Sequence, residues 1–182
     1  YEQDGDTTNG KEPIEWRILA KNDAGQLLVI SEKVLDYQQY NITKDEITWE
    51  RSTIRYWLNG YSTSSKQGIL YSFNYNFIDA AFTMAEREKI VKSNVPAHDN
   101  PDDRTTNAAG NATEDYIFLL SIHEVETYFA DNASRIAYPT RYAKENYARF
   151  DDSRLCLNPQ CDTYWWLRTP GLYRQDGFCY EY

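Results

Sequence analysis

The feature that most constrains the fold is a pair of short apolar segments on either side of a turn. Apolar side chains alternate along Ile14–Ala20, and this period of two is typical of a half-buried β-strand. The cluster Asn22-Asp-Ala-Gly25 then precedes a second apolar run at Leu27–Ile30. Two such runs joined by a short glycine-containing loop predict a β-hairpin.

A series of helix signals follows the predicted hairpin. Ser52 is a favourable N-cap for a helix that runs to Asn59, and Gly60 suits the left-handed position that ends it. The inward face of this helix is expected to carry Ile54, Trp57 and Leu58.

Two capping boxes and one further cap mark the other predicted helices. A helical stretch at Tyr75–Phe82 leads into Thr83 and Glu86, and Ser121 and Glu124 open a helix to about Phe129. Thr140 caps a last short helix, whose apolar side consists of Tyr142, Ala143 and Tyr147.

Three more segments predict extended structure. Ile90–Val95 reads as extended up to Pro96, and the unbroken apolar run Tyr116–Leu120 predicts a fully buried strand. Tyr164–Arg168 carries the strongest strand signal of the C-terminal part, and we expect it in the middle of a small twisted antiparallel sheet. Helices and strands together predict an α+β fold. Because no repeat or linker divides the chain, we expect a single domain over residues 1–182.

The charge disfavours two classes of partner. Lys plus Arg total 19 and Asp plus Glu total 28, which gives a net charge of −9. Such a field repels phosphate backbones and anionic lipids, so nucleic acid and membrane partners are not expected. No window approaches the length of apolar sequence that a membrane span needs. No signal peptide is visible, but the chain begins at Tyr1 without Met, which leaves room for an upstream segment.

The aromatic C-terminal segment is the best candidate for a ligand site. Adjacent residues on a strand point to opposite faces, so one of Trp165 and Trp166 enters the core and the other faces away from it. An outward ring stacks on a sugar or grips an apolar group, and a nearby arginine holds a carboxylate. The alternative is that a covering loop buries the second ring as well. The predicted ligand-binding residues are Tyr164, Trp165, Trp166, Arg168, Tyr173 and Arg174.

The stretch 97–115 is rich in acidic and amide side chains and has almost no apolar residues. A flexible loop with several carboxylates suits calcium, which prefers oxygen ligands. Asp99, Asp102 and Asp103 are the candidate calcium ligands, and apart from calcium we expect no cofactor. Their spacing does not match an EF-hand, and a solvated loop explains the same composition.

Catalytic signals are weak. The chain has two histidines, His98 and His123, and neither stands in a recognisable motif with a nucleophile. Three cysteines, Cys156, Cys161 and Cys179, allow at most one internal disulfide, for which Cys156 and Cys161 are the candidates. Buried free thiols are the alternative. The sequence therefore supports no enzymatic activity.

The order of several motifs resembles a bacterial family of unknown function that is common in Firmicutes and gut-associated genomes. The motifs are Pro13-Ile-Glu-Trp16, Leu27-Leu-Val-Ile-Ser31, Thr48-Trp-Glu50, Ser52-Thr-Ile-Arg55, Trp57-Leu-Asn59, Asn111-Ala-Thr-Glu-Asp115, Ile117-Phe-Leu-Leu-Ser121 and Trp165-Trp-Leu-Arg-Thr-Pro-Gly171. The resemblance implies a C-type lectin-like fold of the formylglycine-generating-enzyme type. The variable proteins of diversity-generating retroelements, which bind ligands through a loop face, share this fold.

The chain departs from the family pattern in two places. The family ends in a G-V-R-P-A-L strand, which the Tyr180-Glu-Tyr182 end lacks, so we expect the last C-terminal strand to be missing. The copper-binding cysteine pair of formylglycine-generating enzymes is not matched by Cys156 and Cys161. The resemblance therefore implies the fold without the oxidase chemistry.

Together these observations predict a non-catalytic domain of an exported or surface-exposed bacterial protein that binds a carbohydrate or a protein. One alternative is a metal-dependent enzyme of the formylglycine-generating-enzyme type. Another is a structural module for protein–protein interaction.

Overall fold

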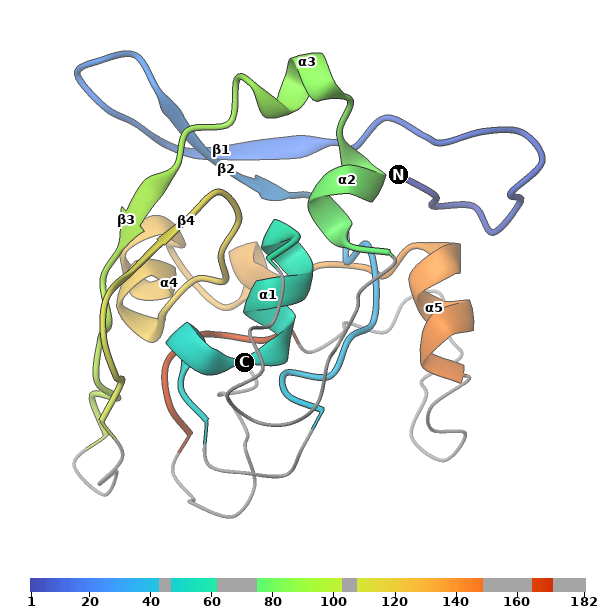
Figure 1. Cartoon of the computed structure of the whole chain (residues 1–182). Coiled ribbons are helices and arrows are strands. Elements are labelled where there is room, and N and C mark those ends of the chain that lie inside the picture. The colour runs from blue at the N-terminus through green and yellow to red at the C-terminus, as the bar shows by residue number, and fades with distance from the viewer. Residues whose placement is uncertain (43–46, 62–74, 103–107, 149–164, 172–182) are drawn as a thin grey trace. The chain divides into compact units, whose positions relative to one another are not determined.

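A computed structural model describes residues 1–42, 47–61, 75–102, 108–148 and 165–171. They form a mixed α and β structure with small antiparallel sheets and short helices, in agreement with the α+β expectation (Figure 1). The chain divides into two compact units, each built from two separate segments. The first unit takes residues 1–38 and 125–165, and the second takes residues 39–124 and those from 166 onward. The prediction of one domain over residues 1–182 stays a prediction.

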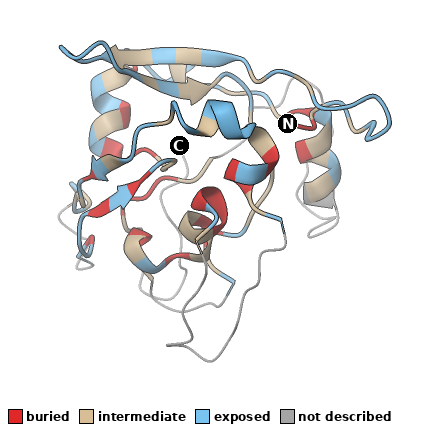
Figure 2. Cartoon of the chain, turned by 45° about the horizontal axis from the view of Figure 1, so that its top comes forward, coloured by how far each residue is buried: buried red, intermediate tan, exposed pale blue. Residues whose placement is uncertain are grey.

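The predicted hairpin is confirmed in the first unit. Strand β1 (Trp16–Lys21) pairs antiparallel with β2 (Leu27–Ser31), and Gly25 has the positive φ of 81° that its turn requires. The pairing register shifts between Ile18 and Ala20, which interrupts the simple alternation. The side chains of Trp16 and Ile18 are exposed to 41% and 60%, so this part of the apolar set faces solvent in the hairpin (Figure 2).

The first predicted helix of the second unit is confirmed in detail. A 3₁₀ turn, η1 (Trp49–Arg51), leads into α1 (Thr53–Asn59). The Ser52 side chain accepts the Arg55 N–H, and Gly60 ends the helix at a φ of 65°. The predicted inward face is buried, namely Ile54, Trp57 and Leu58 (Figure 2).

Short elements follow α1 in the second unit. Helix α2 (Phe77–Ala81) packs Phe77 against Trp57 at a ring distance of 5.7 Å, and α3 (Met84–Arg87) begins with the predicted Thr83–Glu86 capping box. The extended segment before Pro96 contains β3 (Ser93–Val95). It pairs with β4 (Thr113–Asp115), which lies at the end of the predicted acidic loop.

The predicted strand at Tyr116–Leu120 is wrong, because its backbone groups bond elsewhere. The Asn59 side-chain oxygen accepts the N–H groups of Tyr116 and Ile117 at 2.9 and 3.0 Å. Its amide donates to the Ile117 carbonyl at 2.8 Å. One side chain on α1 thus replaces part of a strand ladder, and the apolar run follows an irregular path.

The predicted helix caps at Ser121 and Thr140 are confirmed. Helix α4 (Ile122–Tyr128) begins with the Ser121–Glu124 capping box, and the division between the two units falls within it. In the first unit, a 3₁₀ turn, η2 (Ala133–Arg135), precedes α5 (Arg141–Ala148). The Thr140 hydroxyl accepts the Ala143 N–H at 3.0 Å.

The predicted aromatic strand is also wrong over its described part, 165–168, which belongs to neither two-stranded sheet. The Arg168 N–H bonds to the Leu120 carbonyl at 2.9 Å, and Pro170 has no N–H with which to continue a ladder. Trp165 lies in the first unit, with its ring 6.3 Å from Phe129. Trp166 lies in the second unit, with its ring 5.7 Å from Tyr40.

We predict that Asn59→Ala lowers the free energy of unfolding by about 2 kcal/mol, because it leaves the partly buried backbone groups of Tyr116 and Ile117 without their partner. Urea denaturation measures the change. Asn94→Ala, at an exposed position of β3, is the matched control and is expected to change stability by less than about 0.5 kcal/mol. Equal effects of the two substitutions would contradict the role assigned to Asn59.

Candidate functional site

Two ion pairs with buried members organise the second unit, and the first joins α1 to β4. The fully buried Asp115 carboxylate accepts the Arg55 Nε–H at 2.8 Å and the Trp49 indole N–H at 3.0 Å. The Thr113 hydroxyl also donates to it at 2.6 Å. Because all of these donors come from η1, α1 and β4, the carboxylate serves as a structural centre and has no exposed surface for a ligand.

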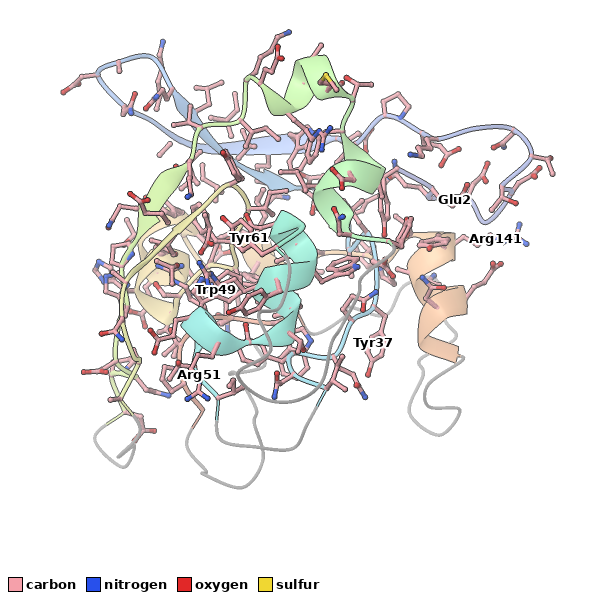
Figure 3. The ribbon with its side chains drawn as sticks, in the orientation of Figure 1. Glu2, Tyr37, Trp49, Arg51, Tyr61 and Arg141 are labelled. Atoms are coloured by element: carbon pink, nitrogen blue, oxygen red, sulfur yellow. The ribbon has the colours of Figure 1, made fainter. Side chains whose placement is uncertain are left out.

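The surroundings of Arg55 extend this centre. Its guanidinium donates to the Glu50 carbonyl at 2.8 Å and lies 5.4 Å from the ring centre of Tyr61. Burial, followed by the charge of Asp115, raises the pKa of the Tyr61 hydroxyl, which donates to the Glu114 carbonyl at 3.1 Å. Figure 3 shows Trp49 and Tyr61 next to α1.

The second ion pair involves a predicted ligand-binding residue, Arg168. Its side chain is 2% exposed and holds both oxygens of Glu124, with Nη2 at 2.7 Å from Oε1. The same guanidinium donates to the Pro96 and Leu119 carbonyls at 3.2 and 2.7 Å. Arg168 therefore does hold a carboxylate, as its chemistry suggests, but the carboxylate belongs to this chain.

Glu124 is charged in spite of its burial. Burial by itself raises the pKa of this carboxyl group, but the hydrogen bond and the charge of Arg168 outweigh burial and lower it overall. Glu124 also accepts the Ser121 N–H in the capping box at 2.9 Å. The ion pair thus ties the segment at Arg168 to the first turn of α4.

A histidine and a serine meet beside this ion pair. His98 Nδ1 lies 3.0 Å from the Ser121 hydroxyl oxygen, and the His98 ring is 5.0 Å from the ring of His123. Burial, followed by the charge of Arg168, lowers the pKa of His98. A serine next to a histidine is the arrangement of an activated nucleophile. Here the Ser121 side chain is fully buried and caps α4 through the Glu124 N–H, so it is not open to a substrate.

Sequence reasoning considered His98 and His123 one at a time and missed their contact. They are far apart in the chain, one after β3 and the other in α4, and no spacing rule links these positions. The contact depends on how the 96–98 segment packs. His98 contacts Ser121 at the start of α4, and the Pro96 carbonyl accepts a hydrogen bond from Arg168.

The structure describes two of the three predicted calcium ligands. Asp99 is exposed and accepts the Ala109 N–H at 2.7 Å, whereas the Asp102 N–H bonds to the Asn100 side chain at 2.9 Å. Asp103 lies outside the described residues. Neither Asp99 nor Asp102 belongs to the group of acidic side chains that the described part of the chain brings within 4.8 Å of one another.

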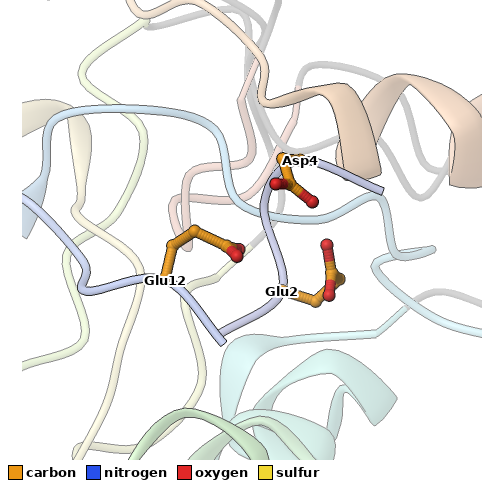
Figure 4. Close-up of side chains that lie close together, drawn as sticks. All are labelled: Glu2, Asp4 and Glu12. Carbon is orange, nitrogen blue, oxygen red and sulfur yellow. The ribbon is translucent and has the colours of Figure 1, made fainter. Parts of the chain in front are cut away.

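That acidic group lies in the first unit and consists of Glu2, Asp4 and Glu12 (Figure 4). Its carboxylates accept backbone N–H groups of their own loop: Glu2 from Gly5 at 2.8 Å and Glu12 from Gln3 at 2.6 Å. A hydrogen bond from the Asp6 backbone, followed by one from Asn9, lowers the pKa of Asp4. These bonds give the group a role in shaping the loop at 2–12.

The remaining predicted site residues have mixed positions. Trp165 and Trp166 are both half-buried, and the Trp165 indole N–H donates to the Arg135 carbonyl at 3.3 Å. Trp165 belongs to the first unit and Trp166 to the second. The following predicted site residues lie outside the described residues: Tyr164, Tyr173, Arg174, Cys156 and Cys161.

Comparison with known proteins identifies a family and no function. A family model described as a domain of unknown function (DUF6273) matches residues 24–181. No curated protein and no solved structure matches the chain. None of the described helices has the length and apolar character that crossing a membrane requires.

The lowered pKa of Glu124 leads to a pH-dependent prediction. A carboxyl group whose pKa is lower in the folded chain stabilises the fold at pH values above its unfolded pKa of about 4.3. This stabilisation is lost as the pH falls through the pKa of the folded state. Glu124→Gln should therefore cost about 2 kcal/mol at pH 7, where it removes a charged partner of Arg168. The cost should shrink once the pH falls below the folded pKa.

Chemical denaturation at a series of pH values from neutral to acidic measures this difference. Glu145→Gln, which removes an exposed partner of Arg141, is the control and should have little effect at any pH. A cost of Glu124→Gln that stays constant as the pH falls would show that the charge of Glu124 does not stabilise the fold.

Proposed function

This chain belongs to DUF6273, a family of domains of unknown function, and we propose that it is a non-catalytic binding domain for a carbohydrate or protein ligand. The proposal includes that the domain belongs to an exported or surface-exposed bacterial protein. It rests on the partial exposure of Trp166, whose ring packs against the buried Tyr40. A half-buried aromatic ring that is held in place by a neighbouring ring is a suitable platform for a sugar face or an apolar side chain.

The sequence around Trp166 adds groups of the same kind. Tyr164 precedes it, and Tyr173 and Arg174 follow Gly171 closely. Aromatic and arginine side chains dominate the binding energy of many interfaces because they combine a large contact area with hydrogen-bonding groups. In this proposal Arg168 supports the site from within, since its guanidinium holds Glu124 and the Leu119 carbonyl.

The state of the reactive side chains supports binding over catalysis. Among the described residues of the second unit, Asp115, Ser121 and Arg168 are buried and bonded to other groups of the chain. A catalytic group must reach its substrate, so these three are poor candidates for direct chemistry. Cys156 and Cys161, which do not match the copper-binding pair of formylglycine-generating enzymes, lie outside the described residues.

We also propose that the fold is a C-type lectin-like fold of the formylglycine-generating-enzyme type. Its support is the order of the sequence motifs, together with the small antiparallel sheets and the long irregular stretches held by polar side chains. An experimental structure tests this assignment directly: a topology unrelated to lectin-like domains would refute it.

Trp166→Ala is expected to lower binding at least about tenfold on an array of immobilised glycans or on a panel of surface proteins, because it removes the main contact surface. Trp16→Ala, which removes an exposed tryptophan from β1, is the matched control and should bind normally. Thermal melting confirms that both variants are folded. Arg174→Ala provides a second test that leaves the Trp166–Tyr40 packing intact.

Unchanged binding by both Trp166→Ala and Arg174→Ala would refute this site. If the unaltered chain binds none of the immobilised glycans or proteins, the binding function itself fails.

Calcium at Asp99, Asp102 and Asp103 is part of the same proposal. An ion that binds only the folded state raises the melting temperature, and the rise grows with the logarithm of the free ion concentration once this exceeds the Kd. We expect calcium chloride to raise the melting temperature of the unaltered chain and not of the Asp99→Asn/Asp102→Asn/Asp103→Asn variant. Magnesium chloride at equal ionic strength controls for screening, and the absence of any calcium-specific shift would refute the site.

A further inference from the structure

The only two histidines of the chain lie side by side in the second unit. His98 is half-buried and follows β3, whereas His123 is exposed in the first turn of α4. Their ring centroids are 5.0 Å apart and their planes meet at 72°. No part of the proposed ligand site uses this pair.

The separation of the rings suits a shared metal ion. A tetrahedral ion binds imidazole nitrogen at about 2.0–2.1 Å, and each ring centroid lies about 1.1 Å behind its nitrogen. With a tetrahedral angle at the metal, the two centroids are then about 5 Å apart. The observed 5.0 Å is close to this separation, so the two rings lie at a distance that one ion can bridge.

The contact between His98 and Ser121 orients one of the ligands. The Ser121 oxygen already accepts the Glu124 N–H at 3.2 Å and has a second lone pair for an N–H from His98 Nδ1, 3.0 Å away. In that tautomer the Nε2 atom of His98 carries the lone pair that can bind a metal ion. Histidine ligands commonly use one ring nitrogen for the metal and fix the ring through the other.

The charges around the pair are compatible with a cation. Arg168 is the nearest positive charge acting on His98, and Glu124 compensates for it by binding the guanidinium through both oxygens. The exposed position of His123 leaves room for water to complete the coordination.

We propose that His98 and His123 form a two-histidine binding site for a divalent transition-metal ion, with Zn²⁺ or Cu²⁺ as its occupant and water as the remaining ligands. Imidazole suits both ions, and Cu²⁺ is expected to bind more tightly than Zn²⁺ in accordance with the general order of divalent-metal affinities. The site is separate from the carboxylate ligands proposed for calcium, which is a hard cation with a preference for oxygen.

Isothermal titration of the full chain, without a histidine tag, with ZnCl₂ and then with CuCl₂ tests the site. We expect one ion per chain, and a loss of affinity of at least about tenfold in both His98→Gln and His123→Gln, since each removes half of the protein ligands. His123 is exposed, so His123→Gln should keep its fold. The electron paramagnetic resonance spectrum of the copper-loaded chain should show coupling to two imidazole nitrogens.

Two control variants separate this site from the other metal-binding groups of the chain. Glu2→Gln/Asp4→Asn removes carboxylates of the acidic group in the first unit, and Cys156→Ser/Cys161→Ser/Cys179→Ser removes all thiols. Both should bind metal as the unaltered chain does. The proposal is overturned if the unaltered chain binds neither ion, if His123→Gln binds as tightly as the unaltered chain, or if either control variant loses binding.

Discussion

In the described part of the second unit, hydrogen bonds and ion pairs from side chains satisfy the polar groups of the interior. They take the place of a continuous sheet. The Asp115 carboxylate collects donors from η1, α1 and β4, and Arg168 bonds carbonyl groups of two further segments as well as Glu124. A buried charge without partners is costly, so these groups hold in place the segments that supply their partners. The fold around them needs few regular strands, because asparagine, arginine and carboxylate side chains form the hydrogen bonds that a strand ladder would otherwise supply.

This arrangement explains several sequence motifs in structural terms. The Thr48-Trp-Glu50 and Asn111–Asp115 motifs meet through the Trp49–Asp115 contact, and Asn59 at the end of α1 bonds the backbone of Tyr116 and Ile117. Arg168, in the Trp165–Gly171 motif, bonds the backbone of the segment that precedes Ser121. The polar motif residues with the most internal partners are therefore organisers of the fold.

Local signals predicted the local structure well. The hairpin and the caps at Ser52, Thr83, Ser121 and Thr140 depend on a few neighbouring residues, and all of them are present. The two predicted strands at 116–120 and 164–168 failed over their described residues, because an apolar run does not determine the partner of the backbone. The predicted full burial of 116–120 is also wrong, since Tyr116 is exposed and, of these five residues, only Leu120 is buried. The ion pairs and the contact of the histidines join distant parts of the chain, and nothing in 28 acidic side chains indicates which of them meets Arg55 or Arg168.

The division of each unit between distant segments has a consequence for biosynthesis. The first unit combines residues 1–38 with residues that begin at 125, so the early hairpin leaves the ribosome long before its partners exist. The apolar side chains of this segment that are buried in the folded unit, Tyr1 and Leu35, remain accessible to chaperones and to other nascent chains during that interval. Closure of such long loops also slows folding relative to a chain of the same size with local contacts.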